Sequence, residues 1–398
     1  MGEARPAGQP CDDVVQPDAR KDRNAVPGRL AVRRDRVATI FELGAEELGQ
    51  LVVGELRLLQ ADDVRLPLIQ PRQQPRQPLL DRVDVPRRDA HSGTLATNRC
   101  EHDSAYRRVA GGASVAERMI ETNGAELCTE SFGRPSDPPV LLIMGIGASM
   151  LWWEEGFCRL LAAEGRFVIR YDHRDTGRST TGEAGSPGYT SADLIADAVG
   201  VLDAYRLPAA HVVGVSAGGA FAQLLALAHP DRILSLVLIS TSPATPGERE
   251  LPPATERYRQ FVASAQVDWS DAGSVVEYLV GYARILAGGV RPFDEAATRE
   301  LVRRDVERAH DIAASENHGL AAEGELPREP LSSLAVPTFV IHGTADPMFP
   351  PAHGEALARE IPGAELLVLG GAGHGVERAD WAPIARAIVR HTAGTNLR

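Results

Sequence analysis

Three residues of this chain have the types and the order of a nucleophilic catalytic triad. Ser216 lies between Gly214 and Gly218 in VVGVSAGG, Asp346 lies in GTADPMFP, and His374 lies in GGAGHGVERAD. A serine hydroxyl is a poor nucleophile at neutral pH, so it needs a nearby base and a third group that orients the base. We therefore predict Ser216 as nucleophile, His374 as general base and Asp346 as orienting acid.

Each member of this set has a second interpretation. Ser216 could be a serine in a turn, because a G-x-S-x-G match is weak by itself. His374 could be a surface loop histidine, and Asp346 could form an Asx turn. Asp380 is an alternative acid, although its place directly before Trp381 is typical of a helix cap. The chain order Ser, Asp, His favours the catalytic interpretation.

The glycine-rich turns predict an oxyanion hole and part of a pocket. Acyl-transfer enzymes commonly stabilise the oxyanion with two backbone N–H groups. One donor is expected at Ala217, directly after the nucleophile, and the other at Ile146 or Gly147, in the loop after PVLLIMG. We expect Gly145 and Trp152, which flank this loop, to contact the substrate.

The elements that must position these residues are strands alternating with helices. AELCTESFG is predicted as an edge strand, and further strands are predicted at 139–145, 166–173, 210–216, 233–241, 337–346 and 364–374. Amphipathic helices are predicted at 149–165, 190–206, 218–230, 352–361 and 380–391. This alternation predicts an α/β fold, with a mostly parallel central sheet and helices on both faces.

The alternation stops between about residues 242 and 331. Three helical stretches are predicted there, at 256–265, 272–288 and 294–314. An insertion of this length with its own secondary structure is not typical of a plain loop. We predict a helical cap above the carboxyl ends of the strands, within a domain that spans 114–398. His318 in this cap is a candidate substrate contact.

Residues 1–113 differ in composition from the rest. They contain two aromatic residues, Phe41 and Tyr106, and four prolines fall within residues 71–86. Such a segment can bury little apolar surface against its ordering entropy. Two interpretations stay open: a mostly disordered extension, or a start codon assigned too far upstream, since Val115 and Met119 lie just before the recognisable domain.

Composition argues against several function classes. The net charge is −12, and the acidic excess lies after residue 113, which is a poor match to nucleic acid or anionic lipid. No apolar run approaches the ~20 residues of a membrane span, so we expect a soluble, cytoplasmic protein. The four cysteines lack disulfide or zinc spacing, and serine chemistry needs no metal or cofactor. The expected partner is a small-molecule ester; the oligomeric state is not indicated.

The chain from about Met119 to His391 resembles the α/β-hydrolase superfamily. Four stretches resemble the aclacinomycin methylesterase group within it: LLIMGIGASMLWW, RYDHRDTGRSTT, HVVGVSAGG and RILAGGVRPFDEA. The resemblance implies the α/β-hydrolase fold, the triad named above, and Ile146 with Ala217 as oxyanion donors. This chain departs from the group at Ile146, where the methylesterase has glycine. A backbone donor tolerates that change, but the bulkier side chain could alter the acyl pocket.

The sequence therefore predicts a carboxylic-ester hydrolase that works through an acyl-enzyme. The resemblance implies the methyl ester of an aromatic or polyketide-like metabolite as substrate. Lactone, thioester or carbon–carbon bond hydrolysis and perhydrolysis stay open, because fold and triad do not set the substrate. A serine nucleophile argues against dehalogenase and epoxide hydrolase chemistry. The alternative from another class is a ligand-binding module with a vestigial triad.

Overall fold

One sheet of eight strands runs through the described part of the chain, residues 117–247 and 249–393 of the computed structural model. The predicted segment 1–113 lies outside the described residues. The strand order is β1-β2-β4-β3-β5-β6-β7-β8. β2 is antiparallel to both neighbours and the other neighbouring pairs are parallel, which confirms the predicted sheet. The strands are β1 (Arg118–Thr122), β2 (Ala125–Phe132), β3 (Pro139–Ile143), β4 (Phe167–Tyr171), β5 (Ala210–Val215), β6 (Ile233–Ile239), β7 (Thr338–Gly343) and β8 (Glu365–Leu369).

The edge of the sheet differs from the prediction. The stretch AELCTESFG is predicted as an edge strand, but β2 within it pairs with β1 on one side and β4 on the other. The edge strand is β1, in which Ile120 is buried whereas Arg118 and Glu121 are exposed. A five-residue strand with one buried side chain gives a weak periodic signal, so the sequence pattern missed it.

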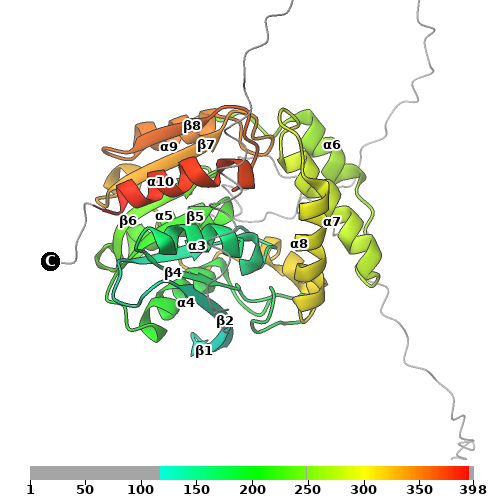
Figure 1. Cartoon of the computed structure of the whole chain (residues 1–398), viewed down its shortest axis with the longest axis horizontal. Coiled ribbons are helices and arrows are strands. Elements are labelled where there is room, and N and C mark those ends of the chain that lie inside the picture. The colour runs from blue at the N-terminus through cyan, green and yellow to red at the C-terminus, as the bar shows by residue number, and fades with distance from the viewer. Residues whose placement is uncertain (1–116, 248, 394–398) are drawn as a thin grey trace, which may run out of the picture. The chain divides into compact units, whose positions relative to one another are not determined.

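Helices cover both faces of the sheet (Figure 1). All residues of β3, β4, β5 and β7 are buried, as expected for strands covered on two sides. One face packs against α3 (Glu155–Ala163) and α10 (Trp381–His391). The other packs against α4 (Ser191–Ala204), α5 (Ala217–Ala228) and α9 (Ala352–Glu360). Among the helices of the described ranges, none has both the length and the apolarity to cross a membrane.

The chain between β6 and β7, residues 240–337, is called the cap segment below. It contains α6 (Glu256–Ser264), α7 (Ala272–Leu286), α8 (Glu295–Arg308) and the 3-10 helix η4 (Ile312–Gly319). Figure 1 shows α6, α7 and α8 lying together beside the layered sheet. Side-chain oxygens of the residues before these four helices cap their first turns, which satisfies amides that have no intrahelical partner: Thr255, Asp271, Asp294 and Asp311.

Candidate active site

Ser216 lies in the turn between β5 and α5, in a backbone conformation that residues with side chains rarely adopt. Its φ is 56° and its ψ is −126°. The Ser216 amide donates to the carbonyl of Ile239 at 3.0 Å, and the Ser216 carbonyl accepts from the amide of Gly219 at 2.9 Å. The neighbouring strand β6 and the first turn of α5 therefore hold the strained turn in place.

Glycines around Ser216 allow a close approach of neighbouring backbone. A Cβ at Gly214 would lie 2.2 Å from the carbonyl oxygen of Gly218, and a Cβ at Gly218 would lie 2.3 Å from that of Ile143. A Cβ at Gly145 would lie 3.2 Å from the Cβ of Ser216 and 3.7 Å from its Oγ. Gly145 therefore keeps space free beside the hydroxyl, and any larger residue there would crowd it.

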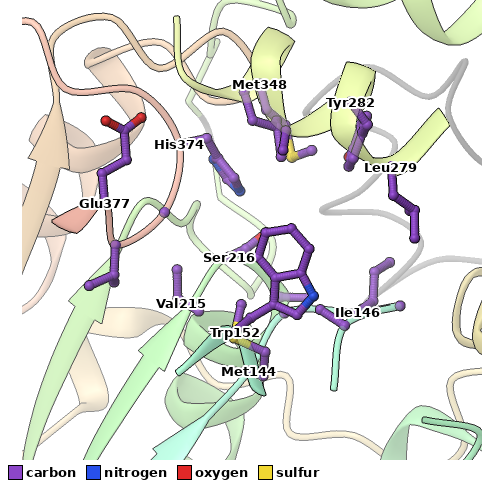
Figure 2. Close-up of a pocket in the computed structure, with 18 of the residues that line it drawn as sticks. Met144, Ile146, Trp152, Val215, Ser216, Leu279, Tyr282, Met348, His374 and Glu377 are labelled. Atoms are coloured by element: carbon purple, nitrogen blue, oxygen red, sulfur yellow. The ribbon is translucent and has the colours of Figure 1, made fainter. Parts of the chain in front are cut away.

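His374 and Asp346 come from the loops that follow β8 and β7. His374 Nδ1 donates to Asp346 Oδ2 at 2.9 Å. The other carboxylate oxygen, Oδ1, accepts the amides of Met348 and Phe349, each at 2.9 Å. Because Nδ1 carries the proton toward Asp346, Nε2 of His374 is left to act as a base. Figure 2 shows His374 and Ser216 facing the same pocket.

Asp346 is buried, yet its surroundings favour the ionised form. Burial by itself raises the pKa of a carboxyl, but the charge and hydrogen bond of His374 and the nearby His342 together hold the pKa of Asp346 below its ordinary value. His342 Nε2 lies 3.6 Å from Asp346 Oδ2 and donates to the carbonyl of Phe349 at 2.7 Å. An ionised acid is what an orienting partner of an imidazole must be.

Asp380, the alternative acid, takes part in a different interaction. Its carboxylate pairs with Arg291 at 2.6 Å. Asp380 lies at the N-cap position of α10, as expected for a helix cap. Its side chain makes no capping hydrogen bond, so the expected side-chain cap is wrong. The structure brings Asp346, and not Asp380, to His374.

The amides of Ile146 and Ala217 are the predicted oxyanion donors. The Gly147 amide already donates to His318 Nδ1 at 2.9 Å. Within the described ranges, the amides of Ile146 and Ala217 donate no hydrogen bond. Both residues line the pocket with Ser216. Of the two alternatives for the second donor, the geometry therefore favours Ile146 over Gly147.

The pocket beside Ser216 has a volume of about 520 Å³. Figure 2 shows Trp152 and Ile146 on its wall near the serine. Trp153, the neighbour of Trp152, packs into the core and also reaches the pocket lining. The cap segment supplies mostly apolar and aromatic side chains to the lining: Tyr278, Leu279, Tyr282, Leu286, Phe293 and Leu301. Such a lining is suited to a bulky apolar ligand.

Asp305 of α8 is a site residue that the sequence reasoning missed. Its buried carboxylate accepts the indole N–H of Trp152 at 2.7 Å and the hydroxyl of Ser149. Burial raises the pKa of Asp305 to about 6, although these two hydrogen bonds act in the opposite direction. Asp305 thus fixes the Trp152 ring against the pocket. The available signal was an aspartate one turn after Leu301, on the buried side of an amphipathic helix.

His318 joins the cap segment to the loop after β3 that contains Ile146 and Gly147, the oxyanion loop. Its Nδ1 accepts from the Gly147 amide at 2.9 Å, and its Nε2 donates to the carbonyl of Arg174 at 2.7 Å. Burial lowers the pKa of His318 to about 4, which keeps the ring neutral with its proton on Nε2. A polar contact to substrate, the expectation for His318, would require one of these bonds to break. The geometry favours a positioning role.

We predict that His318→Phe lowers kcat by about tenfold and leaves KM nearly unchanged. The substitution removes the acceptor of the Gly147 amide, so the adjoining Ile146 amide loses its fixed direction. Steady-state hydrolysis of p-nitrophenyl acetate measures both constants. His229→Phe, at an exposed histidine after α5, is the matched control. A rise in KM at constant kcat would instead favour a direct substrate contact.

Residues 138–265 and 301–376 match the family described as the alpha/beta hydrolase fold. The chain belongs to the α/β-hydrolase fold family. This α/β-hydrolase is 34% identical over 296 residues to rhodomycin D methylesterase DnrP of Streptomyces peucetius, which covers 70% of this chain and 99% of that protein. The likeness confirms the resemblance to methylesterases and shows that this α/β-hydrolase is a carboxylic-ester hydrolase.

Two solved structures show the same architecture. A hydrolase from Pseudomonas aeruginosa PA01 is 28% identical with a TM-score of 0.53, covering 71% of this chain and 100% of its own. The esterase RhEst1 from Rhodococcus sp. ECU1013 is 22% identical with a TM-score of 0.58, over 71% of this chain and 100% of its own. At that identity the second likeness shows the fold alone.

Proposed function

We propose that this α/β-hydrolase cleaves the methyl ester of a polyketide-like aromatic metabolite through an acyl-enzyme on Ser216. The observation that carries the proposal is the hydrogen-bonded pair of His374 and buried Asp346, which faces the pocket of a strained Ser216. The likeness to rhodomycin D methylesterase over 99% of its length supports the class of ester. The apolar and aromatic lining of the pocket supports a bulky acyl group.

The acylation half of the reaction uses the triad and two backbone amides. Ser216 Oγ attacks the ester carbonyl carbon while His374 Nε2 takes its proton, and ionised Asp346 stabilises the resulting imidazolium. The amides of Ile146 and Ala217 donate to the oxyanion of the tetrahedral intermediate. When that intermediate collapses, the C–O bond to the methoxy group breaks and His374 returns the proton to it, which releases methanol.

The deacylation half repeats these steps with water. His374 Nε2 takes a proton from a water molecule, whose oxygen attacks the acyl carbon. The oxyanion is held by the same two amides. Collapse breaks the bond to Ser216 Oγ, and His374 returns the proton to the serine. The carboxylic acid loses its own proton to solvent and leaves as a carboxylate.

The proposal includes a cytoplasmic location for the enzyme. Cys128 and Cys158 are both buried and unpaired. Stable disulfides are typical of oxidising compartments, so two unpaired thiols are in keeping with a reducing one.

The test is a panel of esters given to the purified full-length chain. The panel contains methyl anthracene-2-carboxylate, methyl benzoate, p-nitrophenyl acetate and an aryl lactone, and free acid is quantified by liquid chromatography and mass spectrometry. We expect multiple turnovers on the three-ring methyl ester, with kcat/KM at least about tenfold above that of methyl benzoate, because the larger acyl group buries more apolar surface. Rejection of both methyl esters together with turnover of the acetate would contradict the methyl-ester assignment. A stop after one turnover would favour a binding module.

A further inference from the structure

Glu316 is a charged residue of the pocket that the proposed mechanism does not use. It lies on η4 of the cap segment and lines the pocket with Ser216. Its Oε2 is buried and has no hydrogen-bond partner among the described residues. Burial raises the pKa of this carboxyl to about 7. A buried polar atom without a partner lowers stability, so its presence in a pocket wall needs a reason.

The backbone on both sides of Glu316 is fixed. The backbone of Ser315 lies beside Gly147. A Cβ built at Gly147 would be 3.9 Å from the Ser315 carbonyl oxygen. The side chain of Asn317 donates from Nδ2 to the carboxylate of Asp175 at 2.9 Å. Its Oδ1 accepts from the backbone amide of Gly185 at 2.7 Å. His318 holds the oxyanion loop as described above. The neighbours of Glu316 are thus tied to the main fold, so its backbone is held at the pocket wall.

Two tyrosines of α7 form the surroundings of this carboxyl. Tyr278 and Tyr282 both line the pocket and stack with ring centroids 6.1 Å apart. Burial and then the charge of Glu316 raise the pKa of Tyr278. Burial and the contact with Tyr258 raise the pKa of Tyr282, and the charge of Glu316 adds to this shift. Figure 2 shows Tyr282 on the cap side of the pocket. A carboxylate beside aromatic rings is suited to a hydrogen-bond donor or a cation.

The charge of the pocket wall points to the same kind of ligand. The lining within the described residues includes one arginine, Arg378, whose guanidinium pairs with Glu154. Several carboxyl groups accompany it: Glu154, Asp294, Asp305, Glu316 and Glu377. An anionic group would be repelled here, which also favours departure of a carboxylate product. Asp305 already accepts two hydrogen bonds from the protein, whereas Glu316 Oε2 accepts none.

We propose that Glu316 is a specificity-determining acceptor, which binds a hydroxyl or ammonium group on the acyl part of the substrate. This inference rests on the proposed function and narrows its substrate class to polycyclic aromatic methyl esters that carry a hydrogen-bond donor. A hydrogen bond from the substrate to the Glu316 carboxyl would give this buried group the partner that it lacks among the described residues. An analogue without the donor leaves the buried oxygen unpaired.

Binding is measured apart from turnover by using the Ser216→Ala protein. Isothermal titration calorimetry at pH 8 compares methyl anthracene-2-carboxylate with its hydroxymethyl and aminomethyl derivatives, each as a set of positional isomers. We expect at least one donor-bearing isomer to bind about tenfold or more tightly than the parent ester. Adding Glu316→Leu should remove that preference, and Glu316→Gln should keep part of it, because its carbonyl oxygen still accepts. Glu307→Leu, at an exposed glutamate of α8 outside the pocket, should leave it intact.

Each outcome separates the inference from the proposed function. The role of Glu316 would be overturned if all isomers bound with equal affinity. It would also be overturned if the preference for donor-bearing isomers survived Glu316→Leu in a protein with unchanged Tm. Tighter binding of the aminomethyl than the hydroxymethyl derivative identifies the donor as a cation, and the reverse order identifies it as a hydroxyl. The proposed function alone would be overturned by a combination of two results. The Ser216→Ala protein would prefer donor-bearing isomers, and the unsubstituted chain would hydrolyse no methyl ester.

Discussion

Replacing Ser216 by alanine is expected to lower kcat for p-nitrophenyl acetate by about 10⁶-fold. The substitution removes the one oxygen that forms the acyl bond, and loss of the nucleophile in a serine hydrolase costs about this factor. The backbone at residue 216 is held by the Ile239 and Gly219 contacts, and alanine keeps the Cβ. The fold and the Tm should therefore change little. Initial rates at high enzyme concentration, together with labelling by a fluorophosphonate, measure the loss.

The control for this experiment is Ser186→Ala, at an exposed serine in the loop before α4. It should keep both wild-type rate and labelling. The residual rate of Ser216→Ala should still exceed the uncatalysed rate, because the oxyanion donors and the pocket remain. Another group would be the nucleophile if the folded Ser216→Ala protein still reacted with the fluorophosphonate and hydrolysed the ester at about 1% or more of the wild-type rate.

The sequence predicted the parts of this fold that depend on local pattern. The strands that carry Ser216 and Asp346 are nearly continuous apolar runs, and their predicted bounds agree with β5 and β7 within a few residues. The glycines beside the serine could be recognised for the same reason, since only glycine fits the 2.2 Å and 2.3 Å approaches at Gly214 and Gly218. The apolar runs and the G-x-S-x-G spacing can be recognised without knowledge of distant contacts, although the close approach at Gly218 is to Ile143 of β3.

The contacts between the cap segment and the oxyanion loop could not be predicted in this way. His318 reaches Gly147 across 171 residues of sequence, and Asp305 reaches Trp152 across 153. Contacts of that kind leave no periodicity, because they depend on how two separate elements pack. Glu316 was missed for a related reason, because in the sequence it is one acidic residue among many. In the folded chain it differs from most of them, since its Oε2 is buried without a hydrogen-bond partner among the described residues.

Asp346→Asn is expected to lower kcat by about 10⁴-fold while the protein stays folded. Oδ1 of Asp346 accepts two backbone amides, so the oxygen of an asparagine side chain must take that place. The NH₂ group then faces His374 Nδ1, which must accept a hydrogen bond instead of donating one. The proton of the neutral imidazole moves to Nε2, where the base should be, and the ring can no longer take the proton of Ser216.

The matched control is Asp380→Asn, which removes a carboxylate that pairs with Arg291 and leaves His374 untouched. We expect it to keep kcat within about twofold of wild type, since an ion pair away from the reacting atoms changes stability more than chemistry. The comparison decides between the two acids named from the sequence. A large loss in Asp380→Asn with near-normal activity in Asp346→Asn would reverse the assignment. Comparable large losses in both would mean that the Arg291 contact also orients the histidine loop, because Asp380 ends the 3-10 helix η6 (Arg378–Asp380), which follows that loop.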